Sequence, residues 1–180
     1  MQPTVTPTNA TVGAVLTDVD LANLDDATGR VVENAFHDFG ALIFPNQHLT
    51  EEAQIAFAKR FGDLELLTPD DTMKAVSISN QKENGSVYDP EDFRYKTLRG
   101  NEGWHTDSSY MPLAAKVSIL SAQVVPEEGG ETEVADMRAA YDELSDSMKD
   151  RVSGLEAYHS LYQSQAKIGY NIETGAGYGY

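Results

Sequence analysis

Trp104-His105-Thr106-Asp107-Ser108-Ser109-Tyr110 is the stretch on which the interpretation of the whole chain depends. It places an imidazole and a carboxylate two residues apart, and on an extended segment such side chains point to the same face, about 6.6 Å apart along the strand. His105 and Asp107 can therefore converge on one metal ion with bonds of about 2.1 Å. They supply two of the three ligands of the 2-His-1-carboxylate triad that holds ferrous iron and leaves three positions open. Since the chain holds many Asp residues, this spacing also arises by chance, and alone it does not decide the function.

Composition limits the classes of protein that remain. The chain has 180 residues, with 13 Lys and Arg against 29 Asp and Glu, a formal net charge of −16. That length predicts one domain, residues 1–180, and the acidic balance argues against a nucleic-acid partner or an anionic membrane surface. The absence of Cys excludes disulfides, iron–sulfur clusters, thiolate zinc sites and Cys nucleophiles. No apolar run is long enough for a membrane span and the first residues do not resemble a signal peptide, so we expect a cytoplasmic protein.

Local patterns predict a mixture of helices and strands. Asp25-Asp26 begins a helix that Gly40 ends as a left-handed cap, and Thr50 begins a second helix that Gly62 ends. Strands are expected at 14–19, 41–44, 76–79, 117–125 and 131–135, and further helices at 136–144 and 145–153.

The polar stretch 80–103 is predicted to be a loop. It contains Gly85, Pro90 and Gly100, and loops of this length in a compact domain tend to be lids or binding loops. We therefore expect an active-site loop there.

The remaining His residues and Gly-rich segments carry no recognised catalytic motif. His37 and His48 are expected to be structural or solvated. Gly175-Ala176-Gly177 lacks the strand and helix of a dinucleotide-binding loop.

Segments along nearly the whole chain add to the quoted stretch, in order. They are Ala41-Leu42-Ile43-Phe44, Ile55-Ala56-Phe57-Ala58, Phe61-Gly62, Leu120-Ser121-Ala122, residues 125–133 and residues 135–142. Together they resemble the taurine dioxygenase/2,4-dichlorophenoxyacetate dioxygenase family of Fe(II)- and 2-oxoglutarate-dependent oxygenases. Ile78-Ser79-Asn80 and Asp136-Met137-Arg138 are nearer to the phenoxyacetate branch.

The resemblance implies a role for individual residues. His105 and Asp107 would be the first two iron ligands, and Thr132 would donate a hydrogen bond to a carboxylate of 2-oxoglutarate. Asn101 matches a position near the substrate, and Trp104 would pack away from the metal. The family's distal His ligand and its 2-oxoglutarate-binding Arg lie far downstream. The family also carries a second His, which is not its distal ligand, at the position of His159. His159 is therefore expected not to bind the metal.

Two positions depart from the family's substrate contacts. Asp63-Leu64-Glu65-Leu66-Leu67 replaces the stretch where taurine dioxygenases have a His and a Tyr, and Ser86 stands where the phenoxyacetate enzyme has a Lys. The first departure argues against taurine as the substrate, and the second argues against phenoxyacetate. The resemblance therefore implies an anionic small-molecule substrate other than taurine.

The implied fold is α+β, a double-stranded β-helix (jelly roll) with outer helices, and the 180 residues resemble its N-terminal part, truncated at the C-terminus. The implied activity is hydroxylation of a small organic acid, with Fe(II), 2-oxoglutarate and dioxygen, and release of succinate and carbon dioxide. A metal-binding jelly roll, or a structural or interaction fragment without oxygenase activity, is the alternative. The oligomeric state is left open, a homo-oligomer being one outcome.

Overall fold

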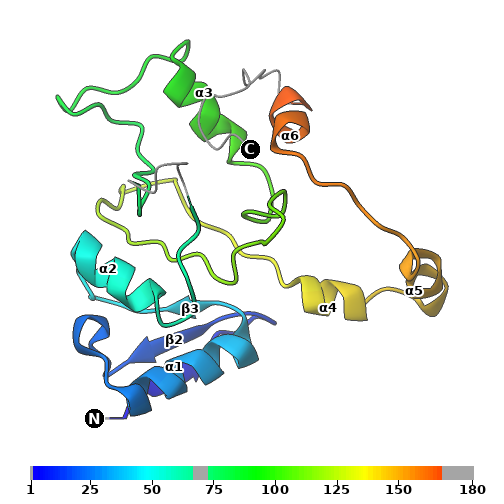
Figure 1. Ribbon diagram of the computed structural model, residues 1–180, viewed down its shortest axis with the longest axis horizontal. Coiled ribbons are helices and arrows are strands. Elements are labelled where there is room, and N and C mark those ends of the chain that lie inside the picture. The colour runs from blue at the N-terminus through cyan, green and yellow to red at the C-terminus, as the bar shows by residue number, and fades with distance from the viewer. Residues whose placement is uncertain (1, 67–72, 168–180) are drawn as a thin grey trace. The chain divides into compact units, whose positions relative to one another are not determined.

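The computed structural model describes residues 2–66 and 73–167 (Figure 1). The chain divides into two compact units, each described here by itself. The first contains Met1–Asp63 and Ile119–Glu156, and the second contains Leu64–Ser118 and Ala157–Tyr180. No helix within the described ranges combines the length and the apolar character needed to cross a bilayer.

A three-stranded sheet forms the base of the first unit. β1 (Thr4–Pro7) pairs antiparallel with β2 (Ala14–Thr17), and β2 pairs parallel with β3 (Leu42–Ile43). The order in the sheet is therefore β1-β2-β3. Gly13, at φ 101°, closes the hairpin by accepting a 2.9 Å hydrogen bond from the Thr8 N–H.

Two predicted helices lie next to this sheet and are confirmed. α1 (Asp26–Phe39) begins at Asp25, whose carboxylate accepts from the Thr28 N–H, and ends at Gly40 with φ 72°. α2 (Glu51–Ala58) begins at Thr50, whose hydroxyl accepts from the Ala53 N–H. The predicted end at Gly62 is wrong, because the α-helical pattern stops at Ala58 and the N–H groups of Arg60 and Phe61 donate to carbonyls three residues earlier. The short 3₁₀ helix η1 (Leu21–Asn23) lies in the chain between β2 and α1. Side-chain capping of free backbone N–H groups is what makes these helix starts readable from sequence.

The core lies between the sheet and these helices. Leu16 of β2 and Val32 of α1 are fully buried, and Phe57 of α2 is 5% exposed. Phe57 makes edge-on contacts with Phe44 and Phe61, at centroid distances of 5.9 and 5.5 Å. Aromatic pairs favour such geometry over face-to-face stacking.

Two short helices complete the first unit. α4 (Met137–Asp142) is capped by Asp136, and α5 (Asp146–Val152) is capped by Ser145, as the sequence predicts. The guanidinium of Arg138 donates from Nη1 to the carbonyl oxygen of His37, 3.2 Å away, at the end of α1. A cation there satisfies a carbonyl that α1 leaves unpaired.

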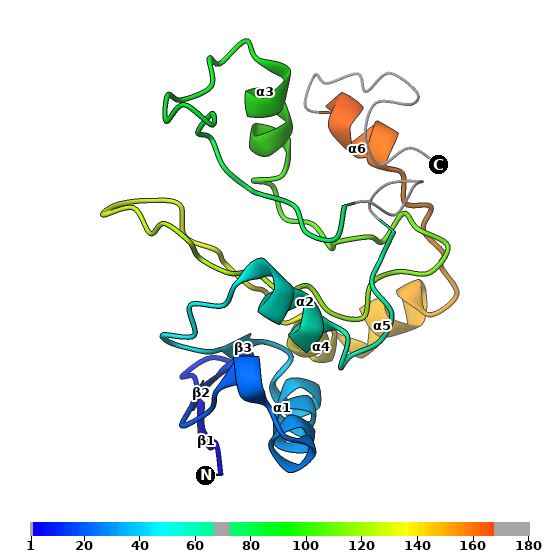
Figure 2. The same cartoon turned by 60° about the vertical axis from the view of Figure 1, so that its left-hand side comes forward.

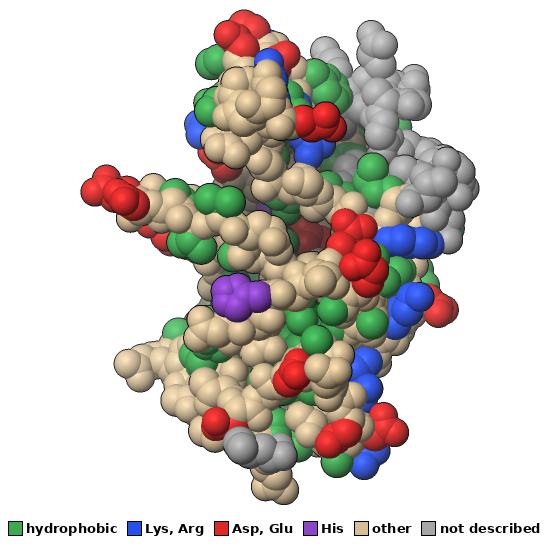
Figure 3. Space-filling view, turned by 90° about the vertical axis from the view of Figure 1, so that its left-hand side faces the viewer, with side chains coloured by type: hydrophobic (Ala, Val, Ile, Leu, Met, Phe, Trp, Pro, Cys, Tyr) green, Lys and Arg blue, Asp and Glu red, His purple; other side chains and the backbone are tan. Residues whose placement is uncertain are grey.

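Residues 119–135, called the arm, extend from the first unit without joining a sheet (Figure 2). Large apolar side chains along the arm are exposed, Val124 by 81%. Its tip carries acidic side chains (Figure 3), among them the exposed Glu127 and Glu128. The predicted strands at 117–125 and 131–135 are therefore wrong as regular strands within the described residues, because a strand forms only where a partner offers a hydrogen-bonding edge.

The second unit contains α3 (Phe93–Gly100) and α6 (Leu161–Lys167). Residues 76–79 join no ladder, so the strand predicted there is also wrong. The predicted α+β class is confirmed. Because the sheet described has three strands, the jelly roll stays a prediction, as does the single domain.

Candidate metal centre

His105 and Asp107 lie together in the second unit, a few residues after α3. His105 Nε2 and Asp107 Oδ1 are 3.1 Å apart, and the two side chains are 51% and 55% exposed. The structure thus places side by side the two side chains that were predicted to be metal ligands, at an exposed position.

The imidazole of His105 is oriented by its other nitrogen. Nδ1 lies 2.7 Å from the carbonyl oxygen of Gly103. Since a carbonyl can only accept, Nδ1 carries the proton and donates it. The neutral ring then has its lone pair on Nε2, the atom that faces Asp107. Metal-binding His residues are commonly held in this way, by a carbonyl at the nitrogen that does not bind the metal.

The two oxygens of Asp107 have separate partners. Oδ2 accepts a 2.7 Å hydrogen bond from the Ser118 hydroxyl, while Oδ1 faces His105. A nitrogen lone pair and a carboxylate oxygen at this distance need a positive charge between them. Either the imidazole becomes protonated and forms an ion pair, or a cation binds to both atoms.

The 3.1 Å separation fits a metal ion. Two atoms bonded to one ion at about 2.1 Å and at right angles to each other are about 3.0 Å apart. Imidazole and carboxylate are also a donor set suited to iron or manganese. Among residues 2–66 and 73–167, however, no three His, Asp or Glu side chains come together at one point. The described residues therefore fit a metal ion with two protein ligands.

A tight turn follows Asp107 directly. Ser108 has φ 55°, is 8% exposed, and its carbonyl oxygen accepts a 2.9 Å hydrogen bond from the Met111 N–H. Its hydroxyl donates to the carboxylate of Glu65, which lies 43 residues earlier in the chain. A left-handed Ser is strained, and such residues persist where their surroundings hold them. This turn holds the backbone that leads out of Asp107.

The remaining predicted residues lie in different places. Asn101 is exposed and ends α3, where its N–H donates to the Leu98 carbonyl. Thr132 belongs to the first unit and lies exposed on the arm. Trp104 is 71% exposed, so the prediction that it packs is wrong for the structure described here. Its neighbours, Gly103 and His105, lie on an exposed, irregular segment that supplies no apolar surface to cover the indole.

The predicted active-site loop, residues 80–103, contains regular structure. Gln81 and Val87 form an antiparallel bridge, and α3 occupies the second half of the stretch. The backbone N–H of Asp89 and the Lys82 ammonium, 3.2 Å away, hold the pKa of the Asp92 carboxyl below its ordinary value. An ionised Asp92 thus fixes the base of the bridged segment, directly before α3.

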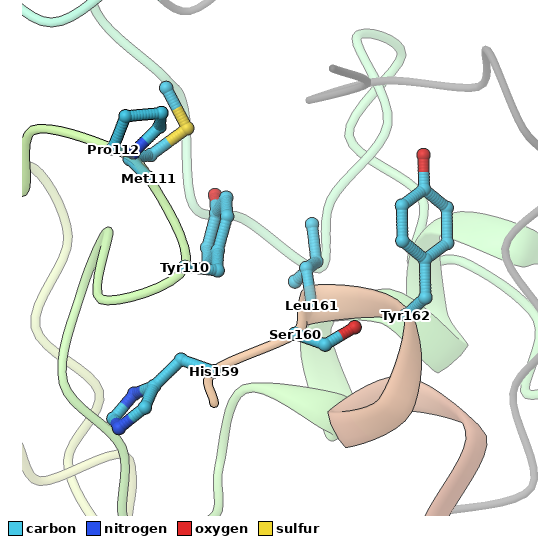
Figure 4. A pocket seen from close by; sticks show the side chains of 7 residues that line it. All are labelled: Tyr110, Met111, Pro112, His159, Ser160, Leu161 and Tyr162. Atoms are coloured by element: carbon cyan, nitrogen blue, oxygen red, sulfur yellow. The ribbon is translucent and has the colours of Figure 1, made fainter. Parts of the chain in front are cut away.

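His159 lines a small pocket of the second unit (Figure 4), and neither His105 nor Asp107 is among the residues that line it. The pocket has a volume of about 150 Å³. One wall follows the turn after Asp107, and the other comes from the start of α6. The lining residues are Tyr110, Met111, Pro112, His159, Ser160, Leu161 and Tyr162.

The formal charge is divided unevenly between the two units. The first unit has nineteen acidic and six basic residues, a net of −13, whereas the second has ten and seven, a net of −3. The unit that carries His105 and Asp107 therefore repels an anionic ligand much less than the overall charge of −16 indicates.

Sequence reasoning missed Ser118, Glu65 and the Gly103 carbonyl. The first two come from positions far from the pair along the chain. Ser118 is one of the alternating residues of an apparent strand, and Glu65 is one of many acids. Nothing in their local patterns marks a partner at the metal pair.

Comparison with known proteins identifies relatives along almost the entire chain. Residues 4–176 match the family model described as "Taurine catabolism dioxygenase TauD, TfdA family". An (S)-phenoxypropionate/alpha-ketoglutarate-dioxygenase of Sphingobium herbicidovorans is 48% identical over 175 residues, which cover 96% of this chain and 58% of that protein. An alpha-ketoglutarate-dependent 2,4-dichlorophenoxyacetate dioxygenase of Burkholderia sp. is 38% identical over 154 residues, which cover 81% and 52%. Alpha-ketoglutarate is 2-oxoglutarate.

Among solved structures, AAD-2 in complex with Mn(II) and N-oxalylglycine is similar to this chain with a TM-score of 0.87 and 35% identity. The match covers 97% of this chain and 62% of that one. The chain thus spans about three fifths of the length of these relatives. The resemblance found in the sequence is confirmed.

Proposed function

The chain belongs to the taurine catabolism dioxygenase TauD, TfdA family, and from this premise we propose that it acts in the Fe(II)- and 2-oxoglutarate-dependent hydroxylation of a small organic acid. The observation that carries the proposal is the pairing of His105 Nε2 with Asp107 Oδ1 at 3.1 Å. The outer atom of each side chain is already occupied by Gly103 or Ser118, so the two inner atoms are left to hold a cation. Family membership alone does not establish an activity, because one fold serves many functions.

Each residue has a distinct part in this proposal. His105 and Asp107 hold the metal, Thr132 donates a hydrogen bond to a carboxylate of 2-oxoglutarate, and Asn101 contacts the substrate. When bound, Fe(II) and 2-oxoglutarate supply the oxidising chemistry with dioxygen, which yields succinate, carbon dioxide and a hydroxylated substrate. The residues of this chain bind and orient these groups. We propose the jelly roll as the complete fold and residues 80–103 as its active-site loop.

For the substrate, we propose an aryloxyalkanoate anion rather than taurine. The relatives with the highest identities reported above are named for phenoxypropionate and 2,4-dichlorophenoxyacetate. Asp63-Leu64-Glu65-Leu66 offers neither the His nor the Tyr that the resemblance associates with a sulfonate. The near-neutral second unit is compatible with an anionic substrate. Nucleic acid and membrane lipid are not proposed as partners.

The test is succinate release by the full-length protein with Fe(II), 2-oxoglutarate and each candidate acid. We expect phenoxypropionate or 2,4-dichlorophenoxyacetate to stimulate succinate release above the rate without substrate, and taurine to do so less. The Asp107→Ala variant should remove the stimulated release. A higher rate with taurine than with either aryloxy acid would contradict the substrate proposal.

The alternative, a metal-binding or structural module without oxygenase activity, is favoured by one observation. Among the described residues, no third His, Asp or Glu joins the two proposed ligands, His105 and Asp107. Metal binding without substrate-dependent succinate release would support this alternative.

A further inference from the structure

Ser118 binds one of the two oxygens of the Asp107 carboxylate and leaves the other to face His105. Its hydroxyl donates to Oδ2 at 2.7 Å, and Oδ1 is left facing His105 Nε2. Ser118 lies eleven residues after Asp107, on the segment that leads to the arm. The hydrogen bond therefore joins two separate stretches of backbone at the metal pair.

A carboxylate without such a bond has no fixed orientation. The terminal torsion of an Asp side chain is broad, so the plane of the carboxylate rotates over a wide range at little cost. The Asp107 backbone cannot rotate in compensation, because the left-handed turn at Ser108 is held by Glu65 and by the Met111 N–H. With the backbone fixed by this turn, the Ser118 hydroxyl selects the orientation of the carboxylate.

We propose that Ser118 is a positioning residue for metal binding: it holds Oδ2 of Asp107, so that Oδ1 alone faces the metal position beside His105. This inference rests on the proposed function, since it takes Asp107 as a metal ligand. Partners of metal ligands commonly alter metal affinity by about 10–100-fold when removed. Asp107 is 55% exposed, so the effect of losing Ser118 lies near the lower end, about tenfold.

The proposal differs from a merely structural role for the same hydrogen bond. Ser118 is exposed, and an exposed hydroxyl contributes little to the free energy of unfolding. We therefore expect the stability of the metal-free protein to be unchanged when the hydroxyl is removed. A structural role would lower that stability, whereas a positioning role changes metal affinity at constant stability. Metal affinity and metal-free thermal stability together separate the two roles.

The experiment measures Mn(II) binding to the full-length protein by the EPR signal of the free ion, for Ser118→Ala, Ser118→Thr and Ser121→Ala. We expect Ser118→Ala to raise the Kd about tenfold, with an unchanged melting temperature of the metal-free protein. Ser118→Thr keeps the hydroxyl and should restore the Kd to within about twofold. Ser121→Ala is the matched control, because this hydroxyl accepts a hydrogen bond from Gln123 and does not contact Asp107.

Mn(II) binding by Asp107→Ala separates a failure of the positioning role of Ser118 from a failure of the proposed function. If Asp107→Ala abolishes Mn(II) binding while Ser118→Ala binds as tightly as the wild type, the positioning role is overturned and the proposed function stands. If Asp107→Ala also binds normally, Asp107 is not a ligand and both are overturned. A fall in metal-free stability that accounts for the whole change in Kd of Ser118→Ala would assign Ser118 a structural role only.

Discussion

Replacing Ser108 by Ala and by Gly separates two contributions to the turn that follows Asp107. Ser108→Ala keeps a side chain in the left-handed conformation at φ 55° but removes the hydroxyl that donates to Glu65. Ser108→Gly removes the hydroxyl as well, and it also relieves the backbone strain. The difference between the two variants therefore reports the relief of backbone strain, reduced by the greater freedom of Gly in the unfolded chain.

The magnitudes follow from burial and conformation. Ser108 is 8% exposed and Glu65 is half-buried, so the lost hydrogen bond to a carboxylate costs about 1.5–2 kcal/mol of unfolding free energy. A left-handed conformation costs a residue other than Gly about 1–2 kcal/mol. Part of the relief in the Gly variant is offset by the greater freedom of Gly in the unfolded chain. We expect the Gly variant to be about 1 kcal/mol more stable than the Ala variant, and both to be less stable than the wild type.

Urea unfolding followed by far-UV circular dichroism measures these free energies. Ser109 provides the matched control, because its φ is not in the left-handed region. At Ser109, the Gly variant should be less stable than the Ala variant by about 0.5–1 kcal/mol, the reverse of the order at Ser108. The same order at both positions would refute the claim that the turn after Asp107 stores strain.

Three further predictions concern helix ends and metal affinity. Gly40→Ala forces a left-handed Ala and places its Cβ 3.1 Å from Arg138 Nη2. The backbone strain should lower the free energy of unfolding by about 1–2 kcal/mol, and the close contact should lower it by a smaller amount. In a double-mutant cycle measured by urea unfolding, the contact contribution should disappear in an Arg138→Ala background. The Thr28 N–H holds the pKa of Asp25 below its ordinary value, so this cap contributes stability above about pH 4 and loses it as the pH falls through the folded-state pKa. The stability difference between wild type and Asp25→Ala should therefore shrink as the pH falls below about 4, the ordinary pKa of Asp, and a constant difference in urea midpoints would contradict this. The resemblance implies a third protein ligand, a distal His, which the described residues do not supply. Four ligands in zinc fingers supply about 10–16 kcal/mol, so one ligand supplies roughly 3 kcal/mol. In parallel titrations the 180-residue chain should therefore bind Mn(II) at least about a hundredfold more weakly than AAD-2.

Local signals predicted the first unit well. Asp25, Gly40 and Thr50 act through backbone groups within a few residues of themselves, so sequence alone locates both ends of α1 and the start of α2. The end of α2 at Ala58 was not located, since Gly62 was predicted to end this helix. Strands 117–125 and 131–135 were predicted from the same kind of pattern, but a strand depends on a partner that local sequence does not specify.

The candidate metal centre shows the same division between local and distant information. His105 and Asp107 are two residues apart, and their side chains lie 3.1 Å from each other, although the segment is irregular rather than the extended strand that the i, i+2 rule assumes. Their role as metal ligands stays a prediction. The contacts from Ser118 to Asp107 and from Glu65 to Ser108 join separate stretches of chain, and no periodicity encodes them. α3 was missed because the glycines and proline of residues 80–103 outweighed the helix-forming run that follows Asp92.

The proposed metal centre requires a metal ion, rather than a proton on the imidazole, to supply the positive charge between His105 Nε2 and Asp107 Oδ1. Isothermal titration of the full-length protein with Fe(II) under anaerobic conditions tests it most directly, for the wild type, His105→Ala, Asp107→Ala and the exposed control His37→Ala. We predict that each of the first two variants weakens Fe(II) binding by at least about tenfold, while His37→Ala binds like the wild type. Unchanged Fe(II) affinity in His105→Ala or Asp107→Ala would show that the two side chains form an ordinary ion pair, and would contradict the claim.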